Sequence, residues 1–337
     1  MRVAKLVAAN TIEVVEGAVP QVTHSKEVQV QVKAVGICGT DLHIFKGERA
    51  DVALPRVMGH ELSGVVTAVG SEVGRVKVGD CVVLDPVFAC GGCPTCDNGF
   101  QNVCDSVKCY GVQMDGGFQD YVVVEEKHLY PYDPSISFEE AALAEPFSIA
   151  ANILERTAVT EKDKVIVIGA GTIGLAIVQA VVGIGAEVVV ADVVDSKLEK
   201  AMDFGAKCVV NSKKQDIKEV LQTVAPTGFN VVIDAVGITP LFEASIEYAA
   251  PRARIACIGF DGKPAQIQPV VITKKELTIV GSRMNCYQFP KVMEWLNDGK
   301  IEAEKMISKQ YSVDDIQQAF EETLTNGEDV VKTLIIF

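Results

Sequence analysis

Apolar and polar positions alternate along several short runs in the first 150 residues. The clearest run has apolar residues at every second position, and three shorter runs resemble it: Val28, Val30, Val32 and Ala34, then 65–69, 82–84 and 121–124. A period of two is typical of half-buried strands, and glycine and aspartate separate the runs as turn residues do. We therefore expect a β-rich domain over residues 1–150.

Continuous apolar runs replace the alternating ones after residue 163. They are 165–168, 188–191, 208–210, 231–233, 255–258 and 277–280. Apolar strands that alternate with helical stretches are typical of a parallel sheet covered on both faces. Six such strands predict a complete doubly wound α/β domain over residues 151–284.

Two connections link this second domain to the first. Residues 137–140 have the form of a capping box and predict a helix that runs on toward Leu154, into the second domain. Beyond residue 285, two helical stretches at 289–296 and 314–324 precede an apolar strand at 333–336. We expect this last strand to return residues 285–337 to the first domain.

The length and the net charge of the chain exclude several classes of function. The 337 residues allow two domains with separate cores, and a net charge of −14 makes nucleic acid and anionic membranes poor partners. No apolar run approaches the roughly 20 residues of a membrane span, and the N-terminus lacks the apolar stretch of a signal peptide. Ten cysteines in such a chain favour thiolates in a reducing compartment, so we expect a cytoplasmic protein.

Four cysteines lie within fifteen residues, at Cys90, Cys93, Cys96 and Cys104. Four thiolates at such spacings suit one tetrahedral zinc ion, and closed sites of this kind are structural. Disulfides, buried free thiols and an iron–sulfur cluster are the alternatives, although the familiar ferredoxin spacing differs. The lobe at about 88–108 is therefore predicted to hold structural zinc and to perform no chemistry.

A glycine-rich turn follows the first apolar strand of the second domain: Gly169, Ala170, Gly171, Thr172, Ile173 and Gly174. The three glycines suit a tight turn, a close backbone approach to a pyrophosphate and close helix packing. Asp192 ends the second strand, where a carboxylate can bind the ribose of NAD. The alternatives are a plain turn with Asp192 as a helix cap, or NADP with Lys197 on its phosphate.

A second set of metal-binding residue types is spread over the first domain. Cys38, His60 and Glu61 could hold zinc with one position open, as catalytic zinc sites require. Glu145 could be an exchangeable fourth ligand or could bond the bound water. Taken separately, a small buried cysteine and a polar His-Glu pair are ordinary. Beside a dinucleotide motif they favour a zinc ion that lowers the pKa of a substrate hydroxyl.

The chain resembles the zinc-dependent medium-chain alcohol and polyol dehydrogenases over essentially its whole length. The resemblance rests on 36–41, 59–61, the four-cysteine lobe, 116–118 and the glycine turn. It implies a GroES-like β-barrel catalytic domain, a Rossmann domain that binds NAD, two zinc ions per subunit, and a homodimer or homotetramer. Glu145-Pro146 stands where ethanol-type members have a second cysteine ligand, as in the sorbitol and sugar-acid branches.

Residues 281–285, 86–90 and 145–151 resemble those of L-galactonate and L-gulonate 5-dehydrogenases. This resemblance implies oxidation of a secondary hydroxyl of a sugar acid, an aldonate, to a ketone with hydride transfer to NAD. Two alternatives stay open. The substrate could be a neutral polyol or simple secondary alcohol, as for sorbitol enzymes, or the protein could bind a nucleotide without catalysis.

Further residues are candidates for the reaction. Thr40 could pass the substrate proton to His43 and on to solvent, although polar residues at a helix start are also ordinary. Arg283 could bind a substrate carboxylate, or equally a structural carboxylate or a cofactor phosphate. Weaker candidates for the wall of the substrate pocket are Phe45, Phe118 and Phe147. Weaker candidates for hydrogen bonds to a polyhydroxylated substrate are Gln113, Asn152 and Asn285.

Overall fold

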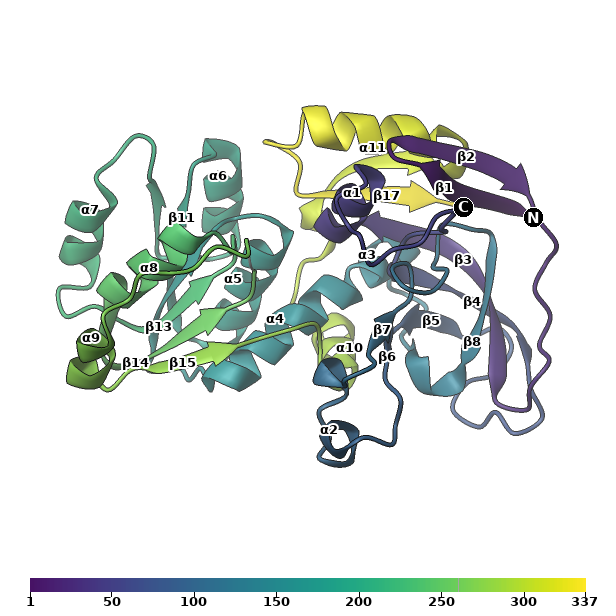
Figure 1. Ribbon diagram of the computed structural model, residues 1–337, viewed down its shortest axis with the longest axis horizontal. Coiled ribbons are helices and arrows are strands. Elements are labelled where there is room, and N and C mark those ends of the chain that lie inside the picture. The colour runs from purple at the N-terminus through teal and green to yellow at the C-terminus, as the bar shows by residue number, and fades with distance from the viewer. Residues whose placement is uncertain (260) are drawn as a thin grey trace. The chain divides into compact units, whose positions relative to one another are not determined.

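A computed structural model describes residues 1–259 and 261–337, which divide into two units (Figure 1). The first unit comprises Met1–Ser148 and Asn285–Phe337, and the second comprises Ile149–Met284. Among the described residues, no helix is long and apolar enough to cross a membrane.

The first unit is built on a seven-stranded, mostly antiparallel sheet. Its strands follow the path β16 (Ile307–Ser312), β17 (Lys332–Ile336), β3 (Glu27–Ile37), β4 (Glu61–Val69), β5 (Cys81–Leu84) and β9 (Leu129–Pro131), with β8 (Tyr121–Glu125) on β3. Alternating side chains of β3 and β8 point into a core that also takes Phe45 and Phe118. A hairpin of β1 (Arg2–Ala8) and β2 (Thr11–Glu16) lies outside this sheet.

The strand expected at 333–336 is β17, and it pairs antiparallel with β3, from Thr333 opposite Ile37 to Ile336 opposite Ala34. The two helical stretches before it are α10 (Phe289–Asn297) and α11 (Ile316–Thr325). Phe320 of α11 packs against Phe45 at a ring distance of 5.1 Å, so the C-terminal segment is part of the core of the first unit.

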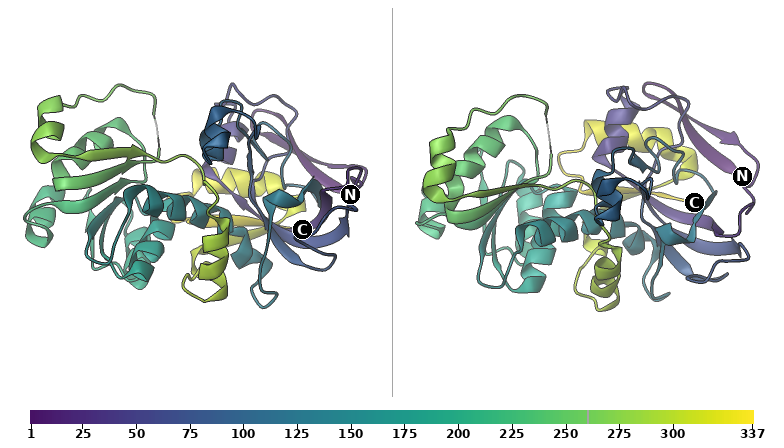
Figure 2. Two further views of the ribbon diagram at one scale, coloured as in Figure 1. Left: turned by 90° about the horizontal axis from the view of Figure 1, so that it is seen from below. Right: turned by 60° about the horizontal axis from the view of Figure 1, so that its bottom comes forward.

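The second unit contains a six-stranded parallel sheet that confirms the predicted doubly wound fold. The strands lie in the order β12 (Cys208–Asn211), β11 (Glu187–Asp192), β10 (Lys164–Ile168), β13 (Phe229–Asp234), β14 (Ala249–Cys257) and β15 (Thr278–Gly281). Helices cover the sheet: α5 (Thr172–Ile184), α6 (Asp195–Asp203), α7 (Ile217–Val224), α8 (Thr239–Tyr248) and α9 (Pro269–Lys275) (Figures 1 and 2). The apolar residues of the central strands β10 and β13 are buried, which accounts for their continuous apolar runs.

The single helix expected from residue 137 to Leu154 is two helices, α3 (Phe138–Ala142) and α4 (Ala144–Thr157). The capping box is present, because Ser137 Oγ accepts a hydrogen bond from Glu140 N at 3.1 Å. Pro146 explains the break. It has no N–H for the carbonyl of Ala142, and its ring would clash with that carbonyl in a continuous helix.

His128 is a buried histidine of the first unit, in the short helix η2 (Glu126–His128) that precedes β9. Its ring lies 5.9 Å from that of Phe88 and 5.5 Å from that of Tyr110, and Nδ1 is 3.2 Å from the Asp85 carbonyl oxygen. Burial, assisted by the charge of Lys127, lowers the pKa of His128 to about 4.

The low pKa of His128 predicts part of the acid sensitivity of the fold. The unfolded chain binds the proton more readily, so stability falls as the pH drops below the ordinary histidine pKa of about 6.5. We expect the wild type to lose about 2 kcal/mol more than His128→Phe between pH 7 and pH 5. Urea unfolding at both pH values measures this. Equal losses in the two proteins would contradict the prediction.

Candidate functional site

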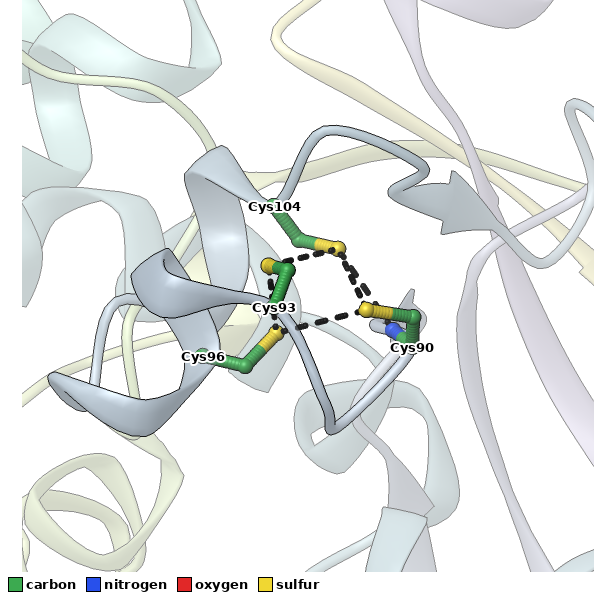
Figure 3. Close-up of side chains that lie close together, drawn as sticks. All are labelled: Cys90, Cys93, Cys96 and Cys104. Atoms are coloured by element: carbon green, nitrogen blue, oxygen red, sulfur yellow. Dashed lines mark hydrogen bonds between the residues drawn. The ribbon is translucent and has the colours of Figure 1, made fainter.

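The four cysteine side chains of the lobe converge on one point (Figure 3). Their Sγ atoms are 3.4 Å apart for Cys90–Cys104, 3.5 Å for Cys93–Cys96, 3.8 Å for Cys93–Cys104 and 3.9 Å for Cys90–Cys96. Zn–S bonds of about 2.3 Å in a tetrahedron place sulfurs roughly 3.8 Å apart, whereas a disulfide requires about 2.05 Å. All four thiols are free, so the residues fit a zinc ion and not a pair of disulfides.

Local backbone geometry prepares this lobe for thiolates. Cys93 caps the short helix α2 (Pro94–Asp97), which brings Cys96 back toward it. The N–H groups of Cys90 and Ser106 donate to Cys104 Sγ and lower the pKa of that thiol to about 6. A thiolate is the form that binds metal.

The ligand atoms of Cys38, His60 and Glu61 lie within 4.8 Å of one another. Cys38 follows β3 and caps helix α1 (Gly39–Phe45), His60 directly precedes β4, and Glu61 begins it. The pairing of β3 with β4 sets Gly36 opposite Glu61 and so brings the two segments together. Sulfur, imidazole nitrogen and carboxylate oxygen form a donor set that fits zinc.

The carboxylate of Asp41 joins the two segments, and the sequence analysis missed it. Asp41 is fully buried; its Oδ2 accepts from Cys38 N at 2.9 Å and its Oδ1 from Gly59 N at 3.2 Å. His60 Nδ1 lies 3.6 Å from Asp41 and has no hydrogen-bond partner among the described residues. Asp41 stands at the third position of α1, where a capping-box acid is a recognisable signal.

Lys332 of β17 is the second residue that the sequence analysis missed. Its Nζ lies 2.8 and 2.6 Å from the two carboxylate oxygens of Glu61 and 3.1 Å from the carbonyl oxygen of Ile37. Both side chains are only 2% exposed. Burial opposes the charge of Lys332, but the Glu61 carboxylate outweighs burial and raises the pKa of the ammonium. A lone lysine in the apolar stretch 331–336 is the signal for a buried pair.

Glu145 lies in the first turn of α4 and is 9% exposed. Burial raises its pKa to about 7, and the charges of His60 and Glu61 also act on it. It is therefore a buried carboxyl group within electrostatic range of the cluster, although the three-residue ligand set above does not include it.

Thr40 and His43 lie three residues apart on α1, so they share one face of that helix. Thr40 is half-buried, and His43 is exposed with Nδ1 2.6 Å from a carboxylate oxygen of Glu48. Thr40 therefore lies close to Cys38 in the sequence, and His43 lies at the solvent-exposed end of the same helix face.

The glycine turn of the second unit has the geometry of a phosphate cradle. Gly169 has φ +100°, and a Cβ on Gly174 would lie 1.9 Å from Gly169 O, so both positions require glycine. Gly171 caps α5 and has open space where its Cβ would be. Thr172 and Ile173 then begin α5, whose N-terminus favours an anion.

Asp192 ends β11 beside this turn. Its carboxylate accepts hydrogen bonds from the N–H groups of Ala170 at 2.5 Å, Val193 at 2.6 Å and Val194 at 2.9 Å. It therefore ties the glycine turn to the end of the second strand. Lys197 lies on α6, half-buried.

The weaker substrate candidates have structural contacts. Asn285 donates to Asp85 at 3.1 Å, and Asn152 donates to Ser282 Oγ at 2.9 Å. The three phenylalanines are at most 1% exposed, so their rings pack the interior: Phe45, Phe118 and Phe147. Gln113 bonds Cys109 N and Asp51, and Arg283 follows β15 with an exposed side chain.

The two metal centres predict different consequences of losing one thiol. We expect Cys104→Ser and Cys38→Ser each to lose about one zinc per chain. Cys104→Ser should also lose several kcal/mol of stability, because the binding free energy of structural zinc is folding free energy. Cys38→Ser should unfold near the wild-type midpoint. Elemental analysis and thermal unfolding measure both, and a Cys104→Ser protein with full zinc content would contradict the assignment.

The buried ion pair predicts a large effect of removing one partner. In the zinc-free protein, Lys332→Met leaves the Glu61 carboxylate buried without its cation, which should cost about 3–5 kcal/mol of stability. Adding Glu61→Gln should restore much of this, since an amide needs no counter-charge. Urea unfolding of both variants tests the pair. If the single and double variants were equally unstable, burial of an unpaired charge would not be the cause.

Comparison with known proteins agrees with this geometry. Residues 24–134 match the alcohol dehydrogenase GroES-like domain, and residues 172–298 match the zinc-binding dehydrogenase family. The starvation-sensing protein RspB of Escherichia coli K12 is 38% identical over 332 residues, 97% of each chain. L-galactonate-5-dehydrogenase of the same strain is 32% identical over 315 residues, 92% of each chain.

A crystal structure of the RspB alcohol dehydrogenase from Escherichia coli CFT073 in complex with NADH has a TM-score of 0.95 and 36% identity. The match covers 100% of this chain and 99% of that one. Both sequence and fold thus agree over nearly the full length. The chain belongs to the zinc-dependent medium-chain alcohol and polyol dehydrogenases.

Proposed function

We propose that this enzyme oxidises a secondary hydroxyl of a sugar acid, an aldonate such as L-galactonate or L-gulonate, to a ketone and transfers the hydride to NAD. The observation that carries the proposal is the cluster of half-buried Cys38 with buried His60 and Glu61, in a chain that also has a glycine cradle for a dinucleotide. The sugar-acid choice is supported by the likeness to L-galactonate-5-dehydrogenase.

The residues of the cluster would hold the zinc ion to which the substrate hydroxyl binds. Zinc bound by Cys38, His60 and Glu61 would supply a Lewis acid that lowers the pKa of that hydroxyl. Asp41 fixes both ligand segments through its two backbone hydrogen bonds, and Lys332 fixes the Glu61 carboxylate.

The proton of the hydroxyl leaves along one face of α1. Thr40 accepts the proton at its hydroxyl oxygen and releases its own hydroxyl proton toward His43. The His43 imidazole takes up that proton and releases one to solvent, with Glu48 orienting the ring at 2.6 Å. Glu145 adds a buried carboxyl group near the cluster that can bond a water or substrate hydroxyl.

The second unit binds the dinucleotide. Its pyrophosphate would lie against Gly171 at the N-terminus of α5, and Asp192 would accept hydrogen bonds from the ribose hydroxyls. The carboxylate at Asp192 repels a 2′-phosphate, which favours NAD over NADP. Bound there, NAD would supply the hydride acceptor, and the protein contributes position and electrostatics.

We also infer a homo-oligomer in the cytoplasm. The free thiols support a reducing compartment, and β15 offers an edge strand with Ile279 exposed on it.

A screen of NADH formation tests the proposed reaction. We expect the zinc-loaded enzyme to oxidise aldonates with higher kcat/KM than the matching neutral polyols or simple alcohols, and with NAD better than with NADP. Chelation should abolish turnover, and Cys38→Ser should lower kcat by about 100-fold or more. Turnover that survives complete removal of zinc would refute the mechanism. Preference for neutral polyols would replace the substrate class and keep the reaction.

A further inference from the structure

One arginine of the first unit is connected through hydrogen bonds to the turn that packs beside His60, although no motif marks it. Arg49 is in the loop that follows α1. Its Nε and Nη2 donate to the two carboxylate oxygens of Asp51, both at 2.7 Å. The remaining terminal nitrogen, Nη1, has no hydrogen-bond partner among the residues that the structure describes. Asp51 thus fixes the orientation of the guanidinium, and the Nη1 group stays available for another hydrogen-bond acceptor.

Hydrogen bonds connect this arginine to the segment next to His60. Asp51 also accepts from Gln113 Nε2 at 2.8 Å, and Gln113 Oε1 accepts from Cys109 N at 3.0 Å. The turn that contains Gln113 packs on Gly59, the residue before His60: Gly117 N donates to Gly59 O at 2.8 Å. The network therefore holds the Arg49 loop against the backbone that carries a metal ligand.

Electrostatic interactions also connect Cys109 with the cluster and with Arg49. Burial raises the pKa of the Cys109 thiol to about 12, and the charges of His60, Glu145 and Cys38 act on the same thiol. The Asp51 hydrogen bonds raise the pKa of Arg49, and Cys109 adds to that effect. Cys109 thus lies within electrostatic range of both the cluster and the guanidinium.

The Arg49–Asp51 ion pair contributes little to the stability of the fold. The two side chains are 34% and 49% exposed, and exposed ion pairs contribute about 0–1 kcal/mol. A chain with a net charge of −14 repels anions, so an anionic substrate needs a local cation near the reacting hydroxyl. An arginine whose fork is held by a carboxylate presents its free N–H groups in a fixed direction.

We propose that Arg49 binds the carboxylate of the sugar-acid substrate, and that Asp51 and Gln113 are positioning residues for it. The inference rests on the proposed function and names a specificity residue for it. Because the cluster and Arg49 are on the same unit, both ends of the substrate would be held by that unit.

Steady-state kinetics of Arg49→Gln on an aldonate and on the neutral polyol of the same length tests the proposal. Loss of hydrogen bonds to a charged group should raise the aldonate KM by about 10- to 100-fold with kcat nearly unchanged. The polyol kcat/KM should change less than about 3-fold. Arg49→Lys should keep part of the preference, and Asp51→Asn should raise the aldonate KM by a smaller factor. Arg252→Gln, which breaks an exposed pair with Glu276 on the second unit, should change neither.

Several outcomes would overturn the assignment. Equal losses of kcat/KM on both substrates would show that Arg49 has a structural role. A loss on the aldonate in Arg283→Ala but not in Arg49→Gln would assign carboxylate binding to Arg283. A loss confined to a polyol phosphate included in the panel would replace carboxylate by phosphate. The proposed function is tested separately, with the wild type alone. If the wild type oxidises only neutral polyols, the proposed function is wrong, and the assignment of Arg49 is then wrong as well. This result would be known before any variant is made.

Discussion

The buried ion pair of Lys332 and Glu61 is the constraint on which the metal cluster depends. Two charges that are 2% exposed are stable only when their remaining hydrogen-bonding capacity is satisfied. Lys332 meets this condition with both Glu61 oxygens and the carbonyl of Ile37. The pair ties the last strand to the start of β4 and to the end of β3. It gives a physical reason for the chain to return to the first unit after completing the second.

Close backbone packing completes the frame around the cluster. A Cβ on Gly36 would lie 2.0 Å from a carboxylate oxygen of Glu61, and Gly59 has φ +90°. A Cβ on Gly116 would lie 2.1 Å from Gly59 O. Glycine is therefore required where the Glu61 carboxylate and the 109–117 turn approach the ligand segments. The 109–117 turn also contains Gln113, which donates to Asp51, the partner of Arg49.

The two metal centres differ in how far apart in sequence their parts lie. The four-cysteine lobe is local, and its spacing alone predicted four converging thiols, which the sulfur distances match. The Cys38 cluster needs β3, β4 and β17 together, so its spacing suggested ligands but not their support. Lys332 was missed because strand pairing sets its partner Glu61, whereas Asp41 was missed although its capping-box contact with Cys38 is local. Pro146 was overlooked as a helix break, although its chemistry was legible in the sequence.

The sequence by itself determined the doubly wound sheet, the glycine turn and the cysteine lobe, because each depends on short-range patterns of burial, backbone freedom or ligand spacing. Only the tertiary structure decided which polar groups meet. It placed Gln113 between Asp51 and Cys109, buried Phe118 in the core, and set Lys332 against Glu61. Lys332 and Glu61 are 271 positions apart in the sequence, and strand register rather than local sequence fixes their geometry.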